Sequence, residues 1–169
     1  MSNSTMAVDD NFIPVHEADF ELVYSIYMSD SINPYMSFEK ISKLAFKECF
    51  DLMANRDEFV FYQENGVRVG IFSLTLGKWR KQHVATIGAL AILPEHQGKG
   101  VASRMMLKVF DHLKIINIQR LELIVECDNP KAISLYKKLG FEIEGTLRAY
   151  LKRDNADEPI DDYAMSILL

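Results

Sequence analysis

The spacing of apolar residues changes along the chain, and each change predicts a different structural element. The run over residues 84–93 is apolar and carries no charged residue in ten positions, as is typical of a strand covered on both faces. Pro94 ends this run because proline has no amide hydrogen to donate to a neighbouring strand. From Val101 to Lys114 apolar residues recur at every fourth position, which predicts an amphipathic helix. The whole stretch therefore predicts a buried strand, a turn, a glycine-containing loop and a helix.

Two helices are predicted near the beginning of the chain. A short apolar segment, Phe12 to Val15, precedes them and suits an edge strand because its proline lies near one end. Asp19 is the expected N-cap of the first helix, and Ser37 is the expected N-cap of the second. The buried stripe of the second helix is predicted to consist of Ile41, Leu44, Ala45, Cys49, Leu52 and Met53.

The rest of the chain predicts further strands and one more helix. Residues 59–62 and 67–76 are β-prone, and the Glu-Asn-Gly sequence between them predicts a hairpin turn. A strand over 121–125 is followed by a helix with Asn129 as N-cap and Gly140 just past its end. Strands over 141–145 and 163–168, joined by a polar segment, complete the chain. This order predicts a mixed sheet with helices on both faces, an α/β (α+β) fold.

Length and charge narrow the classes of protein that the chain can represent. With 169 residues, a single domain over 12–169 is expected after a flexible tail at 1–11. The net charge of −5 does not favour nucleic acid as a partner. Neither an apolar run of about 18 residues nor a cleavable leader is seen, so we expect a cytoplasmic protein without a membrane partner. Cys49 and Cys127 are expected to be reduced and buried, outside any metal site.

The loop over residues 97–102, with the sequence QGKGVA, places backbone amides at a helix N-terminus and so predicts an anion-binding site. A P-loop would need Ser or Thr after Lys99, where Gly100 stands. A dinucleotide fingerprint would need a third glycine and a strand leading directly into the loop, and both are missing. A third pattern, Q/R-x-x-G-x-G/A, is met by Gln97, Gly100 and Ala102.

With this third pattern the chain resembles the GCN5-related N-acetyltransferase (GNAT) superfamily over nearly its whole length. About thirty residues after the loop stands N-x₆-Y-x₃-GF, which begins at Asn129 and contains Tyr136. The chain is most similar to the bacterial L-amino-acid N-acetyltransferase-like branch, on segments that include Arg80-x-x-His83 and Asp161-x-Tyr163. The resemblance implies a GNAT fold, with a mixed, mostly antiparallel sheet of about six to seven strands whose fourth and fifth strands splay apart.

The resemblance also implies acetyl-CoA as the cosubstrate and no metal. The backbone of Leu90, Ala91 and Ile92 would pair with the pantetheine arm, and an amide near Ile92 would stabilise the oxyanion. Asn129 would bind the pantetheine, and a role as helix N-cap is equally well supported. The remaining cofactor-binding residues that the resemblance implies are Gln97, Gly98, Lys99, Gly100, Val101, Ala102 and Ser103.

Acetyl transfer to an amine requires a base for the amine and an acid for the departing thiolate. The family motif makes Tyr136 the general acid, since a phenol with a pKa of about 10 stays protonated at neutral pH; packing in the core is the alternative role. Glu126 and His83 are the candidate bases, and each could instead be a surface or structural residue. An α-amino group loses its proton more readily than a lysine amine, which favours α-amino acceptors.

The expected reaction is direct attack on acetyl-CoA by a primary amine of a small molecule, with an L-amino acid as the leading acceptor. The alternatives are a protein N-terminus or a polyamine as acceptor, and a non-catalytic acyl-CoA-binding module, against which the presence of Tyr136 argues. Asn33 to Met36 and Trp79 are expected to form an apolar wall for the acceptor. A covalent route through Cys127 is disfavoured, His112 is expected at the surface, and the resemblance suggests a homodimer.

Overall fold

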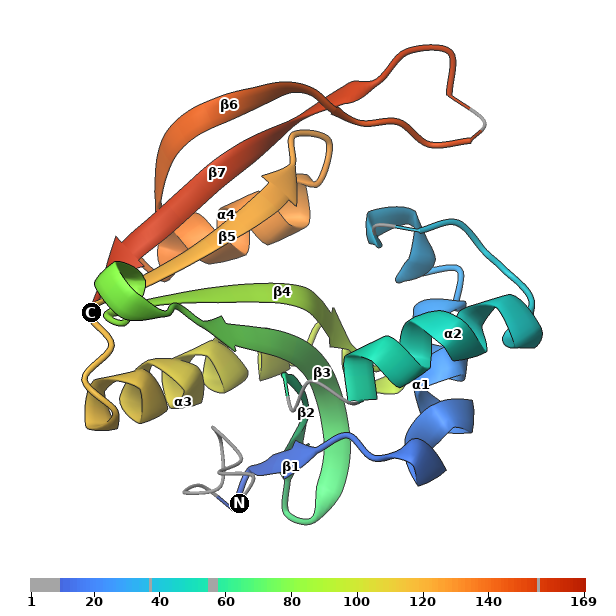
Figure 1. The fold of residues 1–169 in the computed structure, drawn as a ribbon, viewed down its shortest axis with the longest axis horizontal. Helices are drawn as coiled ribbons and strands as arrows, with labels where there is room; N and C mark the ends of the chain where they lie inside the picture. Colours follow the sequence, from blue (N-terminus) through green and yellow to red (C-terminus); the bar gives the residue numbers. More distant parts are fainter. Residues whose placement is uncertain (1–9, 37, 55–57, 155) are drawn as a thin grey trace. The chain divides into compact units, whose positions relative to one another are not determined.

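The computed structural model describes residues 10–36, 38–54, 58–154 and 156–169. The chain divides into two compact units. The first consists of two segments, the chain up to Leu74 and residues Ala89–Lys108. The second consists of Thr75–Gly88 and Val109–Leu169. The helices and strands are β1 (Phe12–Pro14), α1 (Phe20–Tyr27), α2 (Lys43–Ala54), β2 (Phe59–Glu64), β3 (Val67–Leu76), β4 (Val84–Ile92), α3 (Val101–Ile115), β5 (Arg120–Glu126), α4 (Pro130–Lys138), β6 (Glu142–Leu151) and β7 (Ile160–Leu168) (Figure 1).

The strands form one sheet in the order β1-β2-β3-β4-β5-β7-β6. Strands β4 and β5 pair in parallel, whereas β1–β2, β2–β3, β5–β7 and β6–β7 pair in the antiparallel sense. This mixed sheet, and the order of elements along the chain, confirm the α/β (α+β) fold class predicted from the sequence.

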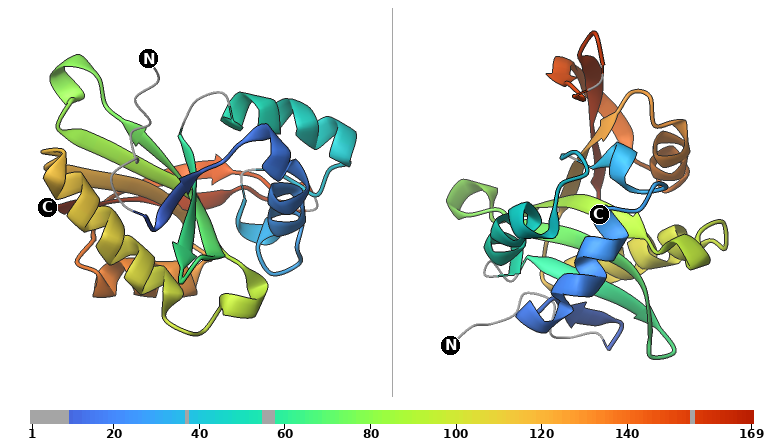
Figure 2. Two further views of the ribbon diagram at one scale, coloured as in Figure 1. Left: turned by 90° about the horizontal axis from the view of Figure 1, so that it is seen from below. Right: turned by 90° about the vertical axis from the view of Figure 1, so that its right-hand side faces the viewer.

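In the first unit, helices cover both faces of the β2–β3 hairpin. Phe61 and Ile71 lie opposite each other in the strand register and belong to a buried core with Phe46 and Phe50 of α2. Figure 2 shows α1 and α2 side by side. On the other face a Cβ placed on Gly70 would lie 3.2 Å from the sulfur of Met105 in α3. Glycine at this position therefore lets α3 pack closely on the sheet.

The buried face of α2 differs from the predicted stripe. Phe46 and Phe50 are fully buried, whereas Leu44 and Leu52 are 85% and 64% exposed. The helix is rotated so that its phenylalanines face the core, because burying a large aromatic ring contributes about 1.5–3 kcal/mol. Cys49 is exposed for the same reason, and the prediction that it is buried was wrong. The predicted N-cap of this helix, Ser37, lies outside the described residues.

The turn between β2 and β3 follows directly from its sequence. Asn65 and Gly66 have φ values of 51° and 76°, and two successive positive φ values are the mark of a type I′ hairpin turn. The proline of β1 lies in a strand that pairs only with β2 at the edge of the sheet, where its missing amide hydrogen is tolerated. Both features confirm the sequence-based prediction.

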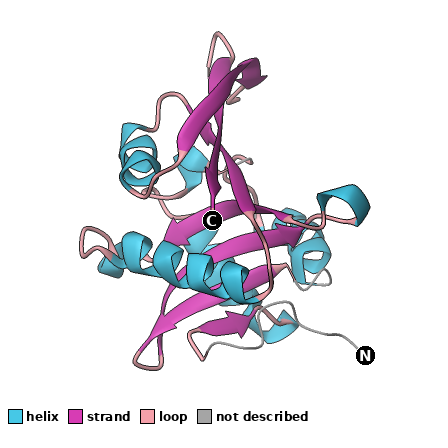
Figure 3. Ribbon diagram, turned by 90° about the vertical axis from the view of Figure 1, so that its left-hand side faces the viewer, coloured by secondary structure: helices cyan, strands magenta, loops and turns pink. Residues whose placement is uncertain are grey.

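In the second unit, β5 has one buried face and one accessible face. Leu121, Leu123 and Val125 are buried, whereas Ile124 between them is 48% exposed. The ring of Phe141 packs against Tyr136 of α4 and Phe110 of α3, with centroids 5.5 and 6.0 Å apart. Strands β6 and β7 form a long twisted hairpin, seen at the top of Figure 3.

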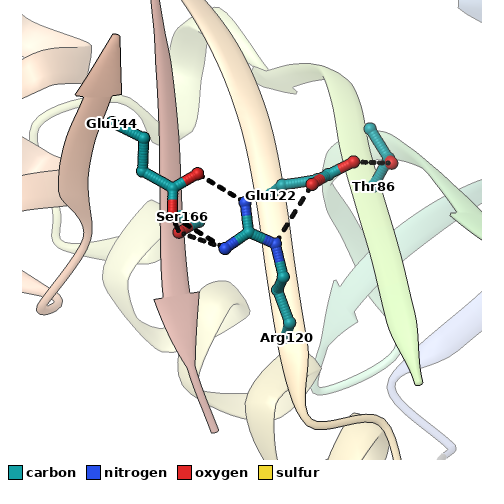
Figure 4. Close-up of polar contacts among 5 residues, drawn as sticks. All are labelled: Thr86, Arg120, Glu122, Glu144 and Ser166. Atoms are coloured by element: carbon teal, nitrogen blue, oxygen red, sulfur yellow. Dashed lines mark hydrogen bonds and ion pairs between the residues drawn. The ribbon is translucent and has the colours of Figure 1, made fainter. Parts of the chain in front are cut away.

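A network of polar side chains ties together four strands of the second unit (Figure 4). The guanidinium of Arg120 donates to both carboxylate oxygens of Glu144, to Glu122 at 3.2 Å and to the hydroxyl of Ser166 at 3.0 Å. Glu122 in turn accepts a hydrogen bond from Thr86 at 3.3 Å. The paired guanidinium lowers the pKa of Glu144 to about 2. This network fixes the register of β4, β5, β7 and β6 on the accessible face.

The structure also bears on the predictions for His112 and for the N-terminal tail. His112 is buried in α3 at 2% exposure, so the prediction that it lies on the surface was wrong; it falls on the apolar side of the helix, one residue before the fully buried Leu113. Most of the predicted tail at 1–11 lies outside the described residues. Over the ranges that the structure describes, no helix has both the length and the apolar character needed to cross a membrane.

Candidate active site

The β4–β5 ladder is short. In the second unit, Val84, Ala85 and Thr86 pair with residues 120–122, and the ladder ends there. Strand β5 nevertheless continues to Glu126, still paired with β7 on its other side. The backbone of β5 beyond residue 122 therefore has no partner from β4 in this ladder, as splayed strands require.

The continuation of β4 in the first unit contains a local distortion. Ala89 has a φ of 47°, a left-handed conformation that costs a residue with a Cβ about 1–2 kcal/mol. Its carbonyl accepts a hydrogen bond of 3.1 Å from the hydroxyl of Tyr27, a fully buried side chain of α1. Burial also raises the pKa of Tyr27, so the hydroxyl remains a donor. Tyr27 thus holds the distorted backbone at Ala89, which directly precedes the predicted pantetheine-binding residues, Leu90 to Ile92.

The glycine loop has the conformation that its sequence predicts. Gly98 and Gly100 have φ values of 72° and 74°, which only glycine adopts without strain. A Cβ on Gly98 would meet no atom within 4 Å, so that face of the loop is open. Glycine is needed here for the backbone conformation, and its small size leaves the loop accessible to a ligand.

Side chains fix the glycine loop from three directions. The amide of Gln97 donates to the carbonyl of Ile92 at 3.0 Å, and Lys99 donates to the carbonyl of Glu95 at 2.8 Å. Arg104 donates to the carbonyl of Lys99 at 2.9 Å and pairs with both carboxylate oxygens of Glu64, at 2.7 and 3.0 Å. The loop is therefore held in place before any ligand binds.

The loop leads into a helix whose first amides are available. The first helical bond of α3 runs from the amide of Arg104 to the carbonyl of Gly100, at 3.2 Å. The amides of Val101, Ala102 and Ser103 precede it and have no acceptor within the helix. Together with the positive end of the helix dipole, they suit an anion with several oxygens, such as a pyrophosphate.

Asn129 and Tyr136 lie on α4 in the second unit. The side-chain oxygen of Asn129 accepts from the amide of Ala132 at 3.1 Å, which confirms the N-cap role and leaves its NH₂ group to donate elsewhere. The ring of Tyr136 is 8% exposed, yet its hydroxyl makes no hydrogen bond with another described residue. By contrast, the hydroxyls of Tyr24 and Tyr27 donate to backbone carbonyls.

The two candidate bases lie at opposite ends of β5. The carbonyl of His83 accepts from the amides of Gln119 and Arg120 at the start of the strand. Glu126 ends the strand six residues after Arg120, which corresponds to about 20 Å. The charge of Glu126 contributes to the raised pKa of Tyr136, after burial. Glu126 is thus the candidate whose charge acts on Tyr136, whereas His83 is exposed and lies at the other end of the strand.

The electrostatic surroundings of Glu126 suit a base. Burial raises its pKa first, and the neighbouring charges of Asp162 and Asp128 raise it further. A raised carboxyl pKa makes proton uptake easier near neutral pH. The thiol of Cys127 also has a raised pKa, chiefly from desolvation, which disfavours its thiolate and hence a covalent cysteine route.

The residues of the predicted acceptor wall belong to different units: Asn33 to Met36 lie in the first and Trp79 lies in the second. Asn33 is buried and donates to the carbonyls of Tyr27 and Phe38, at 3.0 and 3.3 Å, so it holds the loop together. Trp79 is 88% exposed. Sequence reasoning also missed Tyr27, Arg104 and Asp162, whose partners lie 62, 40 and 36 residues away along the chain. No local sequence signal marks such contacts.

A family model described as "Acetyltransferase (GNAT) family" matches residues 20–141. The spermidine N(1)-acetyltransferase of Escherichia coli K12 is 32% identical over 141 residues, covering 79% of this chain and 73% of that protein. The L-amino acid N-acetyltransferase AaaT of the same organism is 39% identical over 88 residues, 52% of each chain.

A similar fold is found among solved structures. The spermidine N-acetyltransferase of Vibrio cholerae, solved in complex with CoA and spermine, superposes with a TM-score of 0.77 at 23% identity, covering 93% of this chain and 94% of that one. The ribosomal-protein-S18-alanine N-acetyltransferase of E. coli gives a TM-score of 0.69 at 21% identity. The family and the GNAT fold that the sequence motifs predicted are both confirmed.

Proposed function

Because this chain belongs to the acetyltransferase (GNAT) family, we propose that it transfers the acetyl group of acetyl-CoA to a primary amine of a small molecule. The amine attacks the thioester directly, and no covalent enzyme intermediate forms. The observation that carries the catalytic role is the hydroxyl of Tyr136, which sits on a buried ring, makes no hydrogen bond within the described residues and is subject to the charge of Glu126. A binding module without turnover would have no use for this arrangement.

The residues of the first unit fit the anionic part of acetyl-CoA. The open face at Gly98 and the available amides of residues 101–103 suit the pyrophosphate. Arg104, which pairs with Glu64, supports the loop through the carbonyl of Lys99. Leu90 to Ile92 would pair with the pantetheine arm through their backbone, and acetyl-CoA itself supplies the activated thioester carbonyl.

The residues of the second unit supply the proton transfers. Glu126 accepts a proton from the attacking amine, aided by its raised pKa. Tyr136 donates its proton to the departing thiolate, and burial keeps its pKa raised so that the proton is present at neutral pH. The free NH₂ group of Asn129 is available to the pantetheine or its thioester. An amide near Ile92 remains our candidate for oxyanion stabilisation.

Release of free thiol from acetyl-CoA over a panel of amines tests this proposal. The panel contains L-amino acids, linear polyamines and a peptide with a free N-terminus, with acetyl-CoA alone as the background. Release above background with at least one amine is expected. Tight CoA binding without release for any amine would overturn the enzymatic proposal and leave the binding module. A cytoplasmic location and a homodimer stay predictions, and light scattering of the purified chain would check the second.

A further inference from the structure

Two carboxyl side chains face each other across β5 and β7. Glu126 is the direct register partner of Asp162 in this antiparallel pair. Directly opposed residues of antiparallel strands point to the same face, with their Cβ atoms about 4.5–5.5 Å apart. Like charges at that distance destabilise a sheet. A chain that needs only a stable sheet would not place two acids here, so the pair calls for a separate explanation.

Asp162 is buried without complete hydrogen bonding. The residue is 5% exposed, and its Oδ1 atom has no hydrogen-bond partner among the described residues. Leaving a buried polar atom unsatisfied is unfavourable, and native proteins rarely do so without a reason. The burial itself raises the pKa of Asp162. The oxygen that lacks a partner belongs to one member of the opposed pair.

Further acidic groups surround the pair. Asp128 is paired with Arg153 through two bonds of 2.6 and 3.1 Å, and Asp161 accepts from the amide of Ala149 at 2.8 Å. Four carboxylates and one guanidinium give a formal excess of three negative charges when all are ionised. Arg153 lowers the pKa of Asp162 and of Glu126, but burial and the neighbouring acids outweigh it in both.

A metal does not explain this cluster. Over the described residues, no group of three or more His, Cys, Asp or Glu side chains is arranged to hold a metal ion. An ammonium ion needs less: two or three oxygens in hydrogen-bonding range and a negative field. Two opposed carboxyls, one of them with a buried acceptor atom that has no partner among the described residues, meet those requirements. The charge of Glu126 also acts on Tyr136, the proposed general acid.

We propose that Asp162 and Glu126 together bind the ammonium group of the acceptor, and that Asp162 makes the enzyme specific for aliphatic di- or polyamines over amino acids. The inference rests on the proposed function and names its substrate class. Glu126 receives the proton that the ammonium loses, while Asp162 keeps its charge and holds the amine in place. Asp162 is therefore a specificity-determining residue.

The charge of the cluster distinguishes the two classes of acceptor. An amino acid carries its carboxylate next to the reactive nitrogen, so binding would bring a further negative charge beside Asp162 and Glu126. A polyamine carries only positive charges, and its distal ammonium groups complement the excess around Asp128 and Asp161. Charge complementarity of this kind selects partners by repelling the wrong one. Thus the two carboxyls favour a polyamine and reject a zwitterion.

The test compares Asp162→Asn with a matched control, Asp157→Asn. Asp157 lies in the connection between β6 and β7, five residues before Asp162, and is exposed, so its replacement removes the same charge without touching the buried pair. Initial rates are measured with spermidine, putrescine and L-alanine. For Asp162→Asn we expect the KM for spermidine to rise at least tenfold and the KM for acetyl-CoA to stay within twofold. Asp157→Asn should stay within twofold in both.

Folding and binding are measured separately from turnover. Because Asp162→Asn removes a desolvated charge opposite another, its melting temperature at neutral pH should equal or exceed that of the unaltered chain. In the presence of CoA, spermidine should raise the melting temperature of the unaltered chain and of Asp157→Asn, but not of Asp162→Asn. Should Asp162→Asn fail to fold, Asp162→Ser provides the same comparison with a smaller side chain.

The outcomes separate this inference from the proposed function. If no amine releases thiol but spermidine stabilises the chain only when Asp162 is present, the ammonium site stands and the enzymatic function fails. If amino acids are the better acceptors, or if Asp162→Asn binds and uses spermidine as well as the control does, the ammonium site is refuted while the acetyltransferase stands.

Discussion

Replacing Tyr136 with phenylalanine is the most direct probe of the proton transfer. The ring is 8% exposed and packs on Phe141 at 5.5 Å and 57°, and phenylalanine keeps both contacts. The hydroxyl makes no hydrogen bond to another described residue, so folding should lose less than about 1 kcal/mol. For a chain of this length that corresponds to a shift of at most about 2–4 °C in melting temperature.

The effect on turnover should be far larger. A positioned general acid contributes about 10²–10⁴ in rate, so kcat should fall by at least about 100-fold while the KM for acetyl-CoA changes little. Burial and the charge of Glu126 raise the pKa of Tyr136, which keeps it protonated over the pH range of the assay. The variant should therefore lower kcat equally across the pH profile and leave the limbs of the profile in place.

Stopped assays of thiol release from pH 6 to 9.5, together with melting curves, make this measurement. Tyr150→Phe is the matched control, since Tyr150 lies on β6 and is 57% exposed; it should match the unaltered chain. A kcat for Tyr136→Phe within threefold of the unaltered value would refute the acid role. So would loss of only the alkaline limb, because that result would mean that Tyr136 titrates in the assay range.

Three more predictions concern the loop, the distorted strand and the polar network. Gly100→Glu should abolish CoA binding in calorimetry while the chain stays folded, because φ is 74° and the new Cβ would lie 3.2 Å from Arg104 Nη1; retained affinity would contradict the pyrophosphate assignment. Ala89→Gly should raise stability by up to about 1 kcal/mol, since relief of left-handed strain exceeds the added freedom of the unfolded chain; a lower melting temperature would show that no strain is present. Arg120→Met should flatten the dependence of melting temperature on pH between about 4.5 and 2. Arg120 lowers the pKa of Glu144 to about 2. The ion pair therefore stabilises the folded chain fully above the ordinary pKa of a glutamate, and this stabilisation is lost as the pH falls toward 2. Parallel curves for the variant and the unaltered chain would contradict it.

Much of the local structure was set by short-range signals. The positive φ values of Asn65, Gly66 and Gly98 follow from the residues themselves, because glycine and asparagine tolerate that conformation. Asn129 caps α4 as predicted, since an N-cap depends only on the next three residues. The glycine loop was recognisable for the same reason. Each of these features is decided within one or two turns of chain.

The errors arose where several local patterns were compatible with the sequence. Helix α2 has apolar residues on more than one face, and only packing against β2 and β3 selects Phe46 and Phe50 for burial. His112 could be assigned to the surface because histidine tolerates both environments. The face that a helix buries depends on which neighbour is larger and closer, and helical periodicity alone does not contain that information.

By itself, then, the sequence determined the order of elements, the glycine loop and the family. Only the tertiary structure decided that Tyr27 holds Ala89, that Arg104 fixes the loop through Glu64, and that Glu126 faces Asp162. These pairs lie far apart along the chain, and strand register or helix packing brings them together. The carboxyl pair shows the difference well: each acid is an ordinary strand residue until the pairing of β5 with β7 places them opposite each other.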